Sequence, residues 1–197
     1  MAYTFVVEDG SMVPNANSYV DVQTATDYLA SNIHVAASWA SISTLNQQQL
    51  LSWATRYLDQ RATWNGTQTS LYLANPAYTN LVDTWASIPA PGTGVPQQSL
   101  RWPRSGVYDV DGNPIESNVI PPALIAATVE MARYLIVNDR SSERPQDGLT
   151  ELKADTITLK FLPDYTLPIV PTEIGYIIRG LGTIASGRTN FSKITRV

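Results

Sequence analysis

The residues that could do acid–base chemistry are few in this chain and poorly spaced. His34 is the single histidine among 197 residues, and there is no cysteine. A catalytic triad would have to use His34, which follows a short predicted helix in an apolar stretch and is typical of a packed or surface histidine. Glu8 and Asp9 are adjacent, and adjacent side chains on an extended backbone point to opposite sides. The sequence therefore predicts no catalytic residue and no cofactor, and a protein that is not an enzyme.

One group of side-chain oxygens suggests calcium coordination. Asp109, Asp111, Asn113 and Glu116 lie within eight residues of one another. The spacing lacks the glycine at the sixth position and the glutamate at the twelfth that a calcium-binding loop requires. Asp111 and Gly112 instead favour a tight turn, because glycine accepts a positive φ without steric cost. We therefore predict a hairpin here and no metal.

The segment Arg101-Trp102-Pro103-Arg104 favours assembly over catalysis. Trp102 offers a large apolar face, Pro103 biases the residue before it toward an extended backbone, and the two arginines offer planar guanidinium groups. Such a segment is suited to docking against a partner. The alternative, favoured for an isolated tryptophan, is that Trp102 closes the core of its own domain.

Composition and charge limit the classes of function. Only 15% of the residues are charged and 44% are hydrophobic, and a surface poor in charge is often partly covered by partners. The net charge of −4 argues against a protein whose main task is to grip phosphate backbones. The four basic residues after Glu173, with no acidic residue among them, leave a net charge of −8 on residues 1–173. The body is acidic and the carboxyl end is basic.

Apolar spacing predicts the helices that would position these residues. Asp21 can cap a helix over 22–31. Thr44 and Gln47 have the spacing of a capping box before a longer helix over 45–61. Two prolines at 121–122 begin the most apolar helix, which runs to about residue 137, and a short helix follows over 172–179.

The remaining segments are predicted to be extended or irregular. A hairpin is expected over 107–115, and alternating apolar residues over 149–161 indicate a strand or a hairpin. Residues 67–98 are interrupted by prolines and glycines and are predicted to form a long loop, in which the short apolar cluster of Leu81, Val82 and Trp85 is compatible with a helical turn or two. Residues 182–197 contain too few apolar side chains for a core of their own. No leader segment and no membrane-spanning run is present, so we expect a soluble protein made in the cytoplasm.

Several sequence blocks, taken in order, resemble the head-tail adaptor (connector) proteins of tailed bacteriophages, many of which carry the label of DnaT-like single-stranded-DNA-binding protein. The resemblance covers about residues 5–137, and the longer 67–98 segment and the basic carboxyl end are departures from it. The blocks that carry it are Val7-Glu8-Asp9-Gly10-Ser11, Ala16-Asn17-Ser18-Tyr19-Val20, Ala54-Thr55-Arg56-Tyr57-Leu58-Asp59, Trp64-Asn65-Gly66, Leu100-Arg101-Trp102-Pro103-Arg104-Ser105-Gly106-Val107 and Ile120-Pro121-Pro122.

The resemblance implies a fold class. We expect a mainly α protein, a small helical bundle of the connector type with a β-hairpin or strand element, extended loops and a carboxyl-terminal arm. Residues 1–181 would form the adaptor domain, with a loop insertion at about 67–98. Residues 182–197 would form a flexible basic arm.

The resemblance also implies a structural role in the virion. The protein would form a homo-oligomeric ring, twelve copies in known relatives, under the portal protein at the capsid vertex. It would join head to tail, contact a tail, nozzle or tail-terminator protein, and continue the channel through which double-stranded DNA passes, without cofactor or membrane. It would be assembled in the host bacterial cytoplasm and lie in the virion neck. The side chains expected to contact partners are Arg101, Trp102, Pro103, Arg104, Trp85, Arg188, Phe191, Lys193 and Arg196.

A single-stranded-DNA-binding protein is the alternative from another class. It needs aromatic platforms interleaved with basic residues, and Trp102 between Arg101 and Arg104 fits this locally. The acidic body and the lack of further patches of this kind favour the adaptor over it.

Overall fold

The computed structural model describes residues 3–70, 98–137, 139 and 168–184, and the backbone of 151–154 and 157–160. The helices in these residues are α1 (Val22–Ala30), α2 (Ala36–Ala40), α3 (Thr44–Arg61), α6 (Pro122–Leu135) and α7 (Thr172–Ile177). They bury one continuous core, whose largest fully buried side chains include Tyr19, Leu29, Trp39, Leu51, Leu58, Trp102, Leu124 and Met131.

The predicted helices are confirmed, with one correction at a helix start. Asp21 caps α1, since its Oδ1 accepts a hydrogen bond from the Thr24 backbone N–H at 2.8 Å. The predicted capping box of α3 is wrong, because Ser43 is the cap and accepts from the Asn46 N–H. Gln47 is buried instead, and its amide nitrogen donates to the Trp39 carbonyl oxygen at 2.9 Å. It joins α3 to α2.

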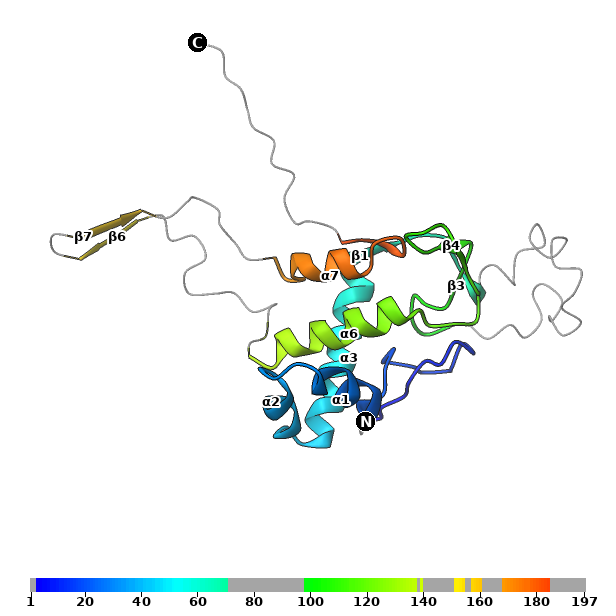
Figure 1. Ribbon diagram of the computed structural model, residues 1–197, viewed down its shortest axis with the longest axis horizontal. Coiled ribbons are helices and arrows are strands. Elements are labelled where there is room, and N and C mark those ends of the chain that lie inside the picture. Colours follow the sequence, from blue (N-terminus) through cyan, green and yellow to red (C-terminus); the bar gives the residue numbers. More distant parts are fainter. Residues whose placement is uncertain are drawn as a thin grey trace, which may run out of the picture.

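Helix α6 lies in the middle of the molecule. Figure 1 shows it between α7 on one side and α1 and α2 on the other, with α3 crossing it. Pro121 precedes its first turn, where the missing proline N–H leaves no helical bond unmade. Contact with helices on several sides explains why this helix is apolar over most of its circumference.

The strands pair into four two-stranded antiparallel sheets within the described residues. Three of these sheets are formed by segments that follow α3 in the chain. They lie around the turn at Asn65 and Gly66 and the segment 101–104. The pairs are β1 (Ala62–Trp64) with β8 (Gly182–Ile184), β2 (Thr67–Gln68) with β3 (Arg104–Ser105), β4 (Val107–Tyr108) with β5 (Pro114–Ile115), and β6 (Glu151–Ala154) with β7 (Ile157–Lys160).

The expected fold class, a mainly α helical bundle, is therefore wrong. The described residues form a mixed structure in which helices make most of the core and short sheets close one end of it. The physical reason is that extended segments satisfy their backbone N–H and carbonyl groups by pairing with segments distant in the chain, as β3 does with β2 and β1 with β8. Helical periodicity carries no information about such pairings between distant segments.

The expected hairpin over 107–115 is confirmed as β4–β5, and of the strand or hairpin expected over 149–161 the structure has the hairpin, β6–β7. Gly182–Ile184, the first three residues of the predicted arm, pair with β1, while 185–197 lie outside the described residues. Of the predicted insertion, Thr67–Gln68 form β2, and 71–97 likewise lie outside them. Within the described residues, no helix is both long enough and apolar enough to span a membrane.

Candidate functional site

Trp102 closes the core of its own chain. Its side chain is fully buried, and its ring packs edge-on against Trp64 with ring centroids 5.9 Å apart and planes at 89°. This is a favourable geometry for two aromatic rings. Neither indole N–H has an acceptor among the described residues. The structure thus supports the internal role of Trp102 over the docking role.

The Arg104 side chain is also held inside its own chain, in this case by hydrogen bonds. Its guanidinium donates to the carbonyl oxygens of Asn65 and Gly66, both at 2.6 Å, and of Arg101 at 3.1 Å, so it fastens the turn after β1. Burial lowers its pKa from the usual value. Pro103, joined to Trp102 by a cis peptide bond, is buried as well. Of the four residues expected to contact a partner here, only Arg101 is exposed.

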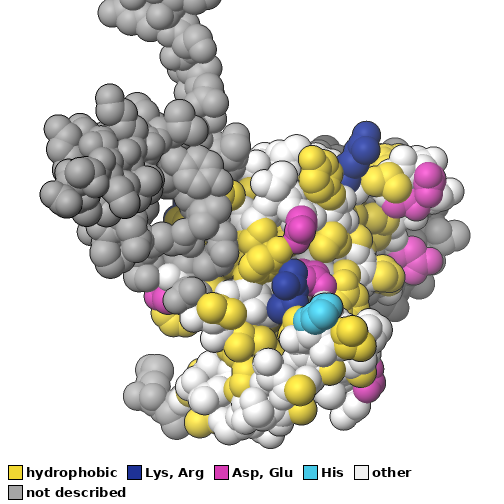
Figure 2. Space-filling model, turned by 60° about the vertical axis from the view of Figure 1, so that its left-hand side comes forward, with side chains coloured by type: hydrophobic (Ala, Val, Ile, Leu, Met, Phe, Trp, Pro, Cys, Tyr) yellow, Lys and Arg dark blue, Asp and Glu magenta, His cyan; other side chains and the backbone are white. Residues whose placement is uncertain are grey.

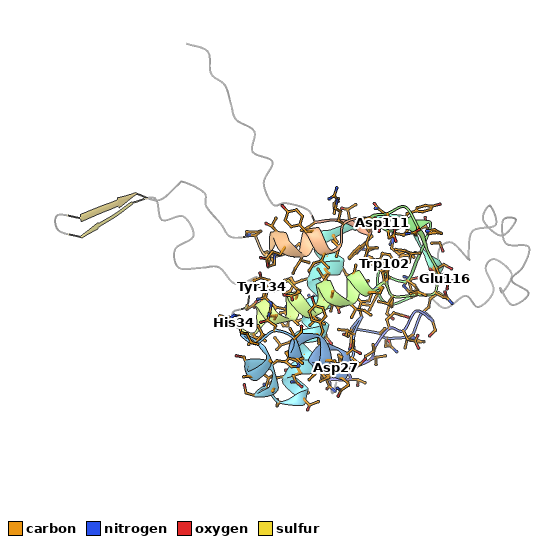
Figure 3. All side chains as sticks on the ribbon, viewed as in Figure 1. Asp27, His34, Trp102, Asp111, Glu116 and Tyr134 are labelled. Atoms are coloured by element: carbon orange, nitrogen blue, oxygen red, sulfur yellow. The ribbon has the colours of Figure 1, made fainter. Side chains whose placement is uncertain are left out.

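The other candidates are placed as follows. Trp85, Arg188, Phe191, Lys193 and Arg196 lie outside the described residues. His34 is exposed between α1 and α2, and Figure 3 shows it near Tyr134, away from Trp102. The Asp109 carboxylate accepts from the N–H groups of Asp111 and Asn113 and so fixes the predicted turn.

Glu8 is a buried structural carboxylate. It accepts hydrogen bonds from the backbone N–H groups of Gly10, Met12 and Val13, each at 2.9 Å. Burial raises the pKa of Glu8, and these hydrogen bonds oppose the rise. Asp9 is exposed and accepts from the Ser11 N–H. Glu8 and Asp9 therefore both stabilise the loop that follows them, by accepting hydrogen bonds from its backbone N–H groups.

A groove of about 970 Å³ is the candidate binding site. We call it the α3 cleft. The amino-terminal segment, one face of α3 and the segment 99–101 line it with side chains of mixed aromatic, amide and charged type. These residues are Tyr3, Ala16, Asn17, Gln49, Ser52, Trp53, Thr55, Arg56, Asp59, Gln60, Ser99, Leu100 and Arg101.

One stripe of α3 supplies the floor of the cleft. Gln49, Trp53, Arg56 and Gln60 are spaced by four, three and four residues, so they lie on one helix face. All four are exposed, and Trp53 keeps 46% of its side chain open to solvent. The opposite face of the same helix packs into the core. An exposed indole beside a guanidinium therefore follows directly from the register of α3.

A second aromatic ring is fixed at the edge of the cleft. Tyr3 is 43% exposed, and its hydroxyl lies 2.8 Å from the Ser52 Oγ. Since the Ser52 hydroxyl donates to the Asn17 Oδ1 at 3.2 Å, its oxygen accepts from Tyr3. The Asn17 amide nitrogen in turn donates to the Thr4 carbonyl oxygen. These bonds tie the amino-terminal segment to α3.

Residues 99–101 form one wall of the cleft, which we call the Arg101 wall, and this wall is hydrogen-bonded to Asp59. The Arg101 N–H donates to Asp59 Oδ2 at 3.1 Å, and the Tyr19 hydroxyl donates to Asp59 Oδ1 at 2.5 Å. The same hydroxyl accepts from the Trp102 N–H at 3.2 Å. Burial raises the pKa of Asp59 to about 6, although both hydrogen bonds and the charges of Arg101 and Arg104 oppose the rise.

The α3 cleft is equipped to bind a ligand with negative charges and flat rings. Arg56 and Arg101 provide fixed positive charge, while Tyr3 and Trp53 provide exposed π faces. A smaller hollow of about 500 Å³ lies between α3 and the end of α6 and shares Gln49 and Trp53 with the cleft. Trp53 therefore stands between the two hollows.

Sequence reasoning missed this site. It followed the apolar face of the helix, Leu50, Ala54, Tyr57 and Leu58, and so passed over the stripe opposite. A signal was present, because Trp53 and Arg56 occur at helical spacing on the face predicted to be exposed. The approach of Tyr3 and Arg101 to that stripe has no counterpart in the local sequence.

Comparison with known families gives one match. The chain matches the family model described as "Putative DnaT-like ssDNA binding protein" over residues 3–90 and 91–197. Because these two matches together span nearly the whole chain, the chain belongs to this family. No curated protein and no solved structure matches it. The family description carries the DnaT-like label that we expected from the resemblance. It names no head-tail adaptor, so the adaptor role is a proposal.

Proposed function

We propose that this protein binds single-stranded DNA in the α3 cleft. The observation that carries the proposal is the presence of Trp53, Tyr3, Arg56 and Arg101 around one groove. Proteins that bind single strands combine aromatic faces on which bases stack with basic groups that follow the backbone. The description of the matched family supports the same function.

Each side chain has an expected contribution. Trp53 stacks on one base, a contact worth about 1–3 kcal/mol for single-strand binders. Arg56 and Arg101 each neutralise one phosphate, so the binding constant should fall with salt with a logarithmic slope of about −1.4. The net charge of −4 opposes tight binding and implies a modest affinity.

The test is fluorescence anisotropy with a labelled single-stranded oligonucleotide over a range of salt concentrations. Trp53→Ala should weaken binding at least fivefold through the lost stacking contact. Arg56→Ala and Arg101→Ala should each reduce the salt slope by about 0.7, since each removes one phosphate contact.

Tyr176→Ala and Arg179→Ala are matched controls. Both residues are exposed and lie outside the cleft; one is aromatic like Trp53 and the other is an arginine like Arg56 and Arg101. Circular dichroism checks that every variant remains folded. Equal losses in the control and cleft variants, or no binding by the wild-type protein, would refute the proposal.

The second candidate function is the head-tail adaptor that forms a ring. Exposed apolar side chains favour it: Ile33, next to the histidine between α1 and α2, is 84% exposed, and Val137, just after α6, is 77% exposed. Ile33 follows α1 and Val137 follows α6, and these two helices pack together. Figure 2 shows a face on which apolar side chains are spread among polar uncharged ones, with separate acidic and basic side chains between them. Such a surface suits contact between copies of one chain.

Native mass spectrometry tests the adaptor candidate. The purified protein should form a closed ring, alone or with a portal protein, and Ile33→Asp should prevent its assembly. A protein that remains monomeric with the portal and is missing from purified virions would exclude this role. Oligonucleotide binding by that monomer would leave the first proposal in place.

A further inference from the structure

We infer that Asp59 is the positioning residue of the α3 cleft, and that the ionisation of its carboxyl group controls the Arg101 wall. The inference rests on the proposed function for its effect on nucleic-acid affinity. Its structural part, a proton-linked change at Arg101, concerns this chain alone and can be tested without a ligand.

The geometry gives Asp59 a connecting position. Its two oxygens join α3 to two other parts of the chain, because one accepts from the Arg101 N–H and the other from the Tyr19 hydroxyl. The Tyr19 hydroxyl in turn accepts a hydrogen bond from the Trp102 N–H. Tyr19 is also fixed to α3 by its own N–H, which donates to Thr55 Oγ1 at 3.3 Å. The carboxylate is thus the junction of α3, the segment before α1 and the cleft wall.

The groups that face Asp59 can be named for each neighbouring element. Tyr19 faces it from the segment before α1, Arg101 from the segment before β3, and Arg104 from β3 itself. On α3, Arg56 lines the cleft that Asp59 also lines. The Tyr19 pKa is raised well above its usual value by burial and by the Asp59 charge, so Tyr19 stays protonated. Asp59 is therefore the group in this junction that changes charge near neutral pH.

Protonation of Asp59 has two consequences. One carboxyl oxygen becomes a donor, so Asp59 can no longer accept from both Tyr19 and Arg101 in the present arrangement. The negative charge near the Arg101 and Arg104 guanidinium groups also disappears, so the positive potential of the cleft toward phosphate increases. With a pKa of about 6, the change occurs between pH 7 and 5. We expect a single strand to bind about fivefold more tightly at pH 5 than at pH 7.5, the factor for one unit charge a few ångströms away in water.

The experiment follows the Arg101 backbone amide by NMR and oligonucleotide affinity by anisotropy from pH 7.5 to 5. In the wild-type protein, the Arg101 amide shift should titrate with a midpoint near 6, and affinity should rise with the same midpoint. Asp59→Asn should abolish both titrations and bind at pH 7.5 as the wild type does at pH 5. Asp27→Asn, which removes an exposed carboxylate from α1, and His34→Gln, which removes the single histidine, should leave both titrations unchanged.

A second variant covers the case in which Asp59→Asn does not fold. Tyr19→Phe removes a hydrogen bond that lowers the Asp59 pKa, so the Arg101 titration should shift to higher pH. A purely structural role of Asp59 would not move this midpoint.

The outcomes separate the inference from the proposed function. An Arg101 amide that does not titrate near pH 6, or that titrates equally in the Asp59 variant, overturns the inference even when oligonucleotide binds. A titrating amide in a protein that binds no oligonucleotide at any pH leaves the Asp59 junction in place and rejects the proposed function.

Discussion

Single carboxylate groups accept hydrogen bonds that hold segments of this protein in place. Sequence reasoning looked for paired acids that could transfer protons, and the structure instead uses isolated acids as hydrogen-bond acceptors. Glu8 binds three backbone N–H groups, and Asp59 binds one N–H and one hydroxyl. A carboxylate suits this use because it offers several lone pairs and no competing donor.

The raised pKa of Asp59 predicts how stability depends on pH. The folded-state pKa is about 6 and the ordinary value is 3.8, so the folded protein holds this proton more tightly than the unfolded chain does. The stabilisation is complete below pH 3.8 and is lost as the pH rises through 6, by about 3 kcal/mol in all. Urea denaturation at pH 4 and pH 7.5 should show this loss in the wild type and in Asp27→Asn. The loss should be about 3 kcal/mol smaller in Asp59→Asn, which keeps the contributions of the other carboxyl groups, among them Glu8 with its raised pKa. An equal loss in that variant would contradict the prediction.

At the scale of elements, short loops and strands position the segments that line the α3 cleft. The loop after Glu8 rests against the backbone of residues 118–119, the turn at Asn65 and Gly66 is fastened by Arg104, and β3 follows the cleft wall directly. Each contact joins segments that are far apart in the sequence. The helices supply most of the apolar burial, while these polar contacts determine where the extended segments lie.

Gly10 provides a test of one such contact. Its φ is +104°, and a Cβ there would lie 1.9 Å from the Asn118 carbonyl oxygen. Gly112 in the β4–β5 turn also has a positive φ, +86°, but open space around it. Gly112→Ala should cost about 1–2 kcal/mol from backbone strain alone. Gly10→Ala should cost clearly more, measured as the free energy of unfolding, because its neighbours must move. Similar costs would show that the loop adjusts freely.

At the scale of the whole molecule, β8 joins the carboxyl-terminal part of the chain to the end of α3. Its three residues pair with β1, and a Cβ on Gly182 would lie 3.0 Å from the Trp64 ring. The Trp64 ring in turn packs against Trp102. The boundary between body and arm predicted at Gly182 therefore coincides with the start of a strand that pairs with β1.

Two truncations test the role of β8. A chain that ends after Ile184 keeps the strand, and its free energy of unfolding should match that of the full chain. A chain that ends after Leu181 loses the pairing with β1 and the cover over Trp64, and should be less stable by at least about 1 kcal/mol. Thermal and urea denaturation of both chains measure the difference. Equal stability would mean that β8 contributes nothing to the fold.

The sequence by itself determined the local elements. The Asp21 cap, the two prolines at the start of α6 and the Asp-Gly turn each act within a few residues, so their helices and hairpin were predicted correctly. Net charge and composition likewise need no coordinates. The preference for a buried Trp102 followed from the general behaviour of tryptophan and agrees with its complete burial.

The tertiary structure alone decided the fold class and the candidate site. The pairing of β1 with β8 joins residues about 120 positions apart, and the Arg101–Asp59 bond spans 42. Such contacts arise when whole elements pack, because burial of apolar faces brings distant backbone and side-chain groups within hydrogen-bonding range. Spacing along the chain does not encode which distant partner a residue meets. For that reason Trp53, Arg56 and Arg101 became a single cleft only in three dimensions.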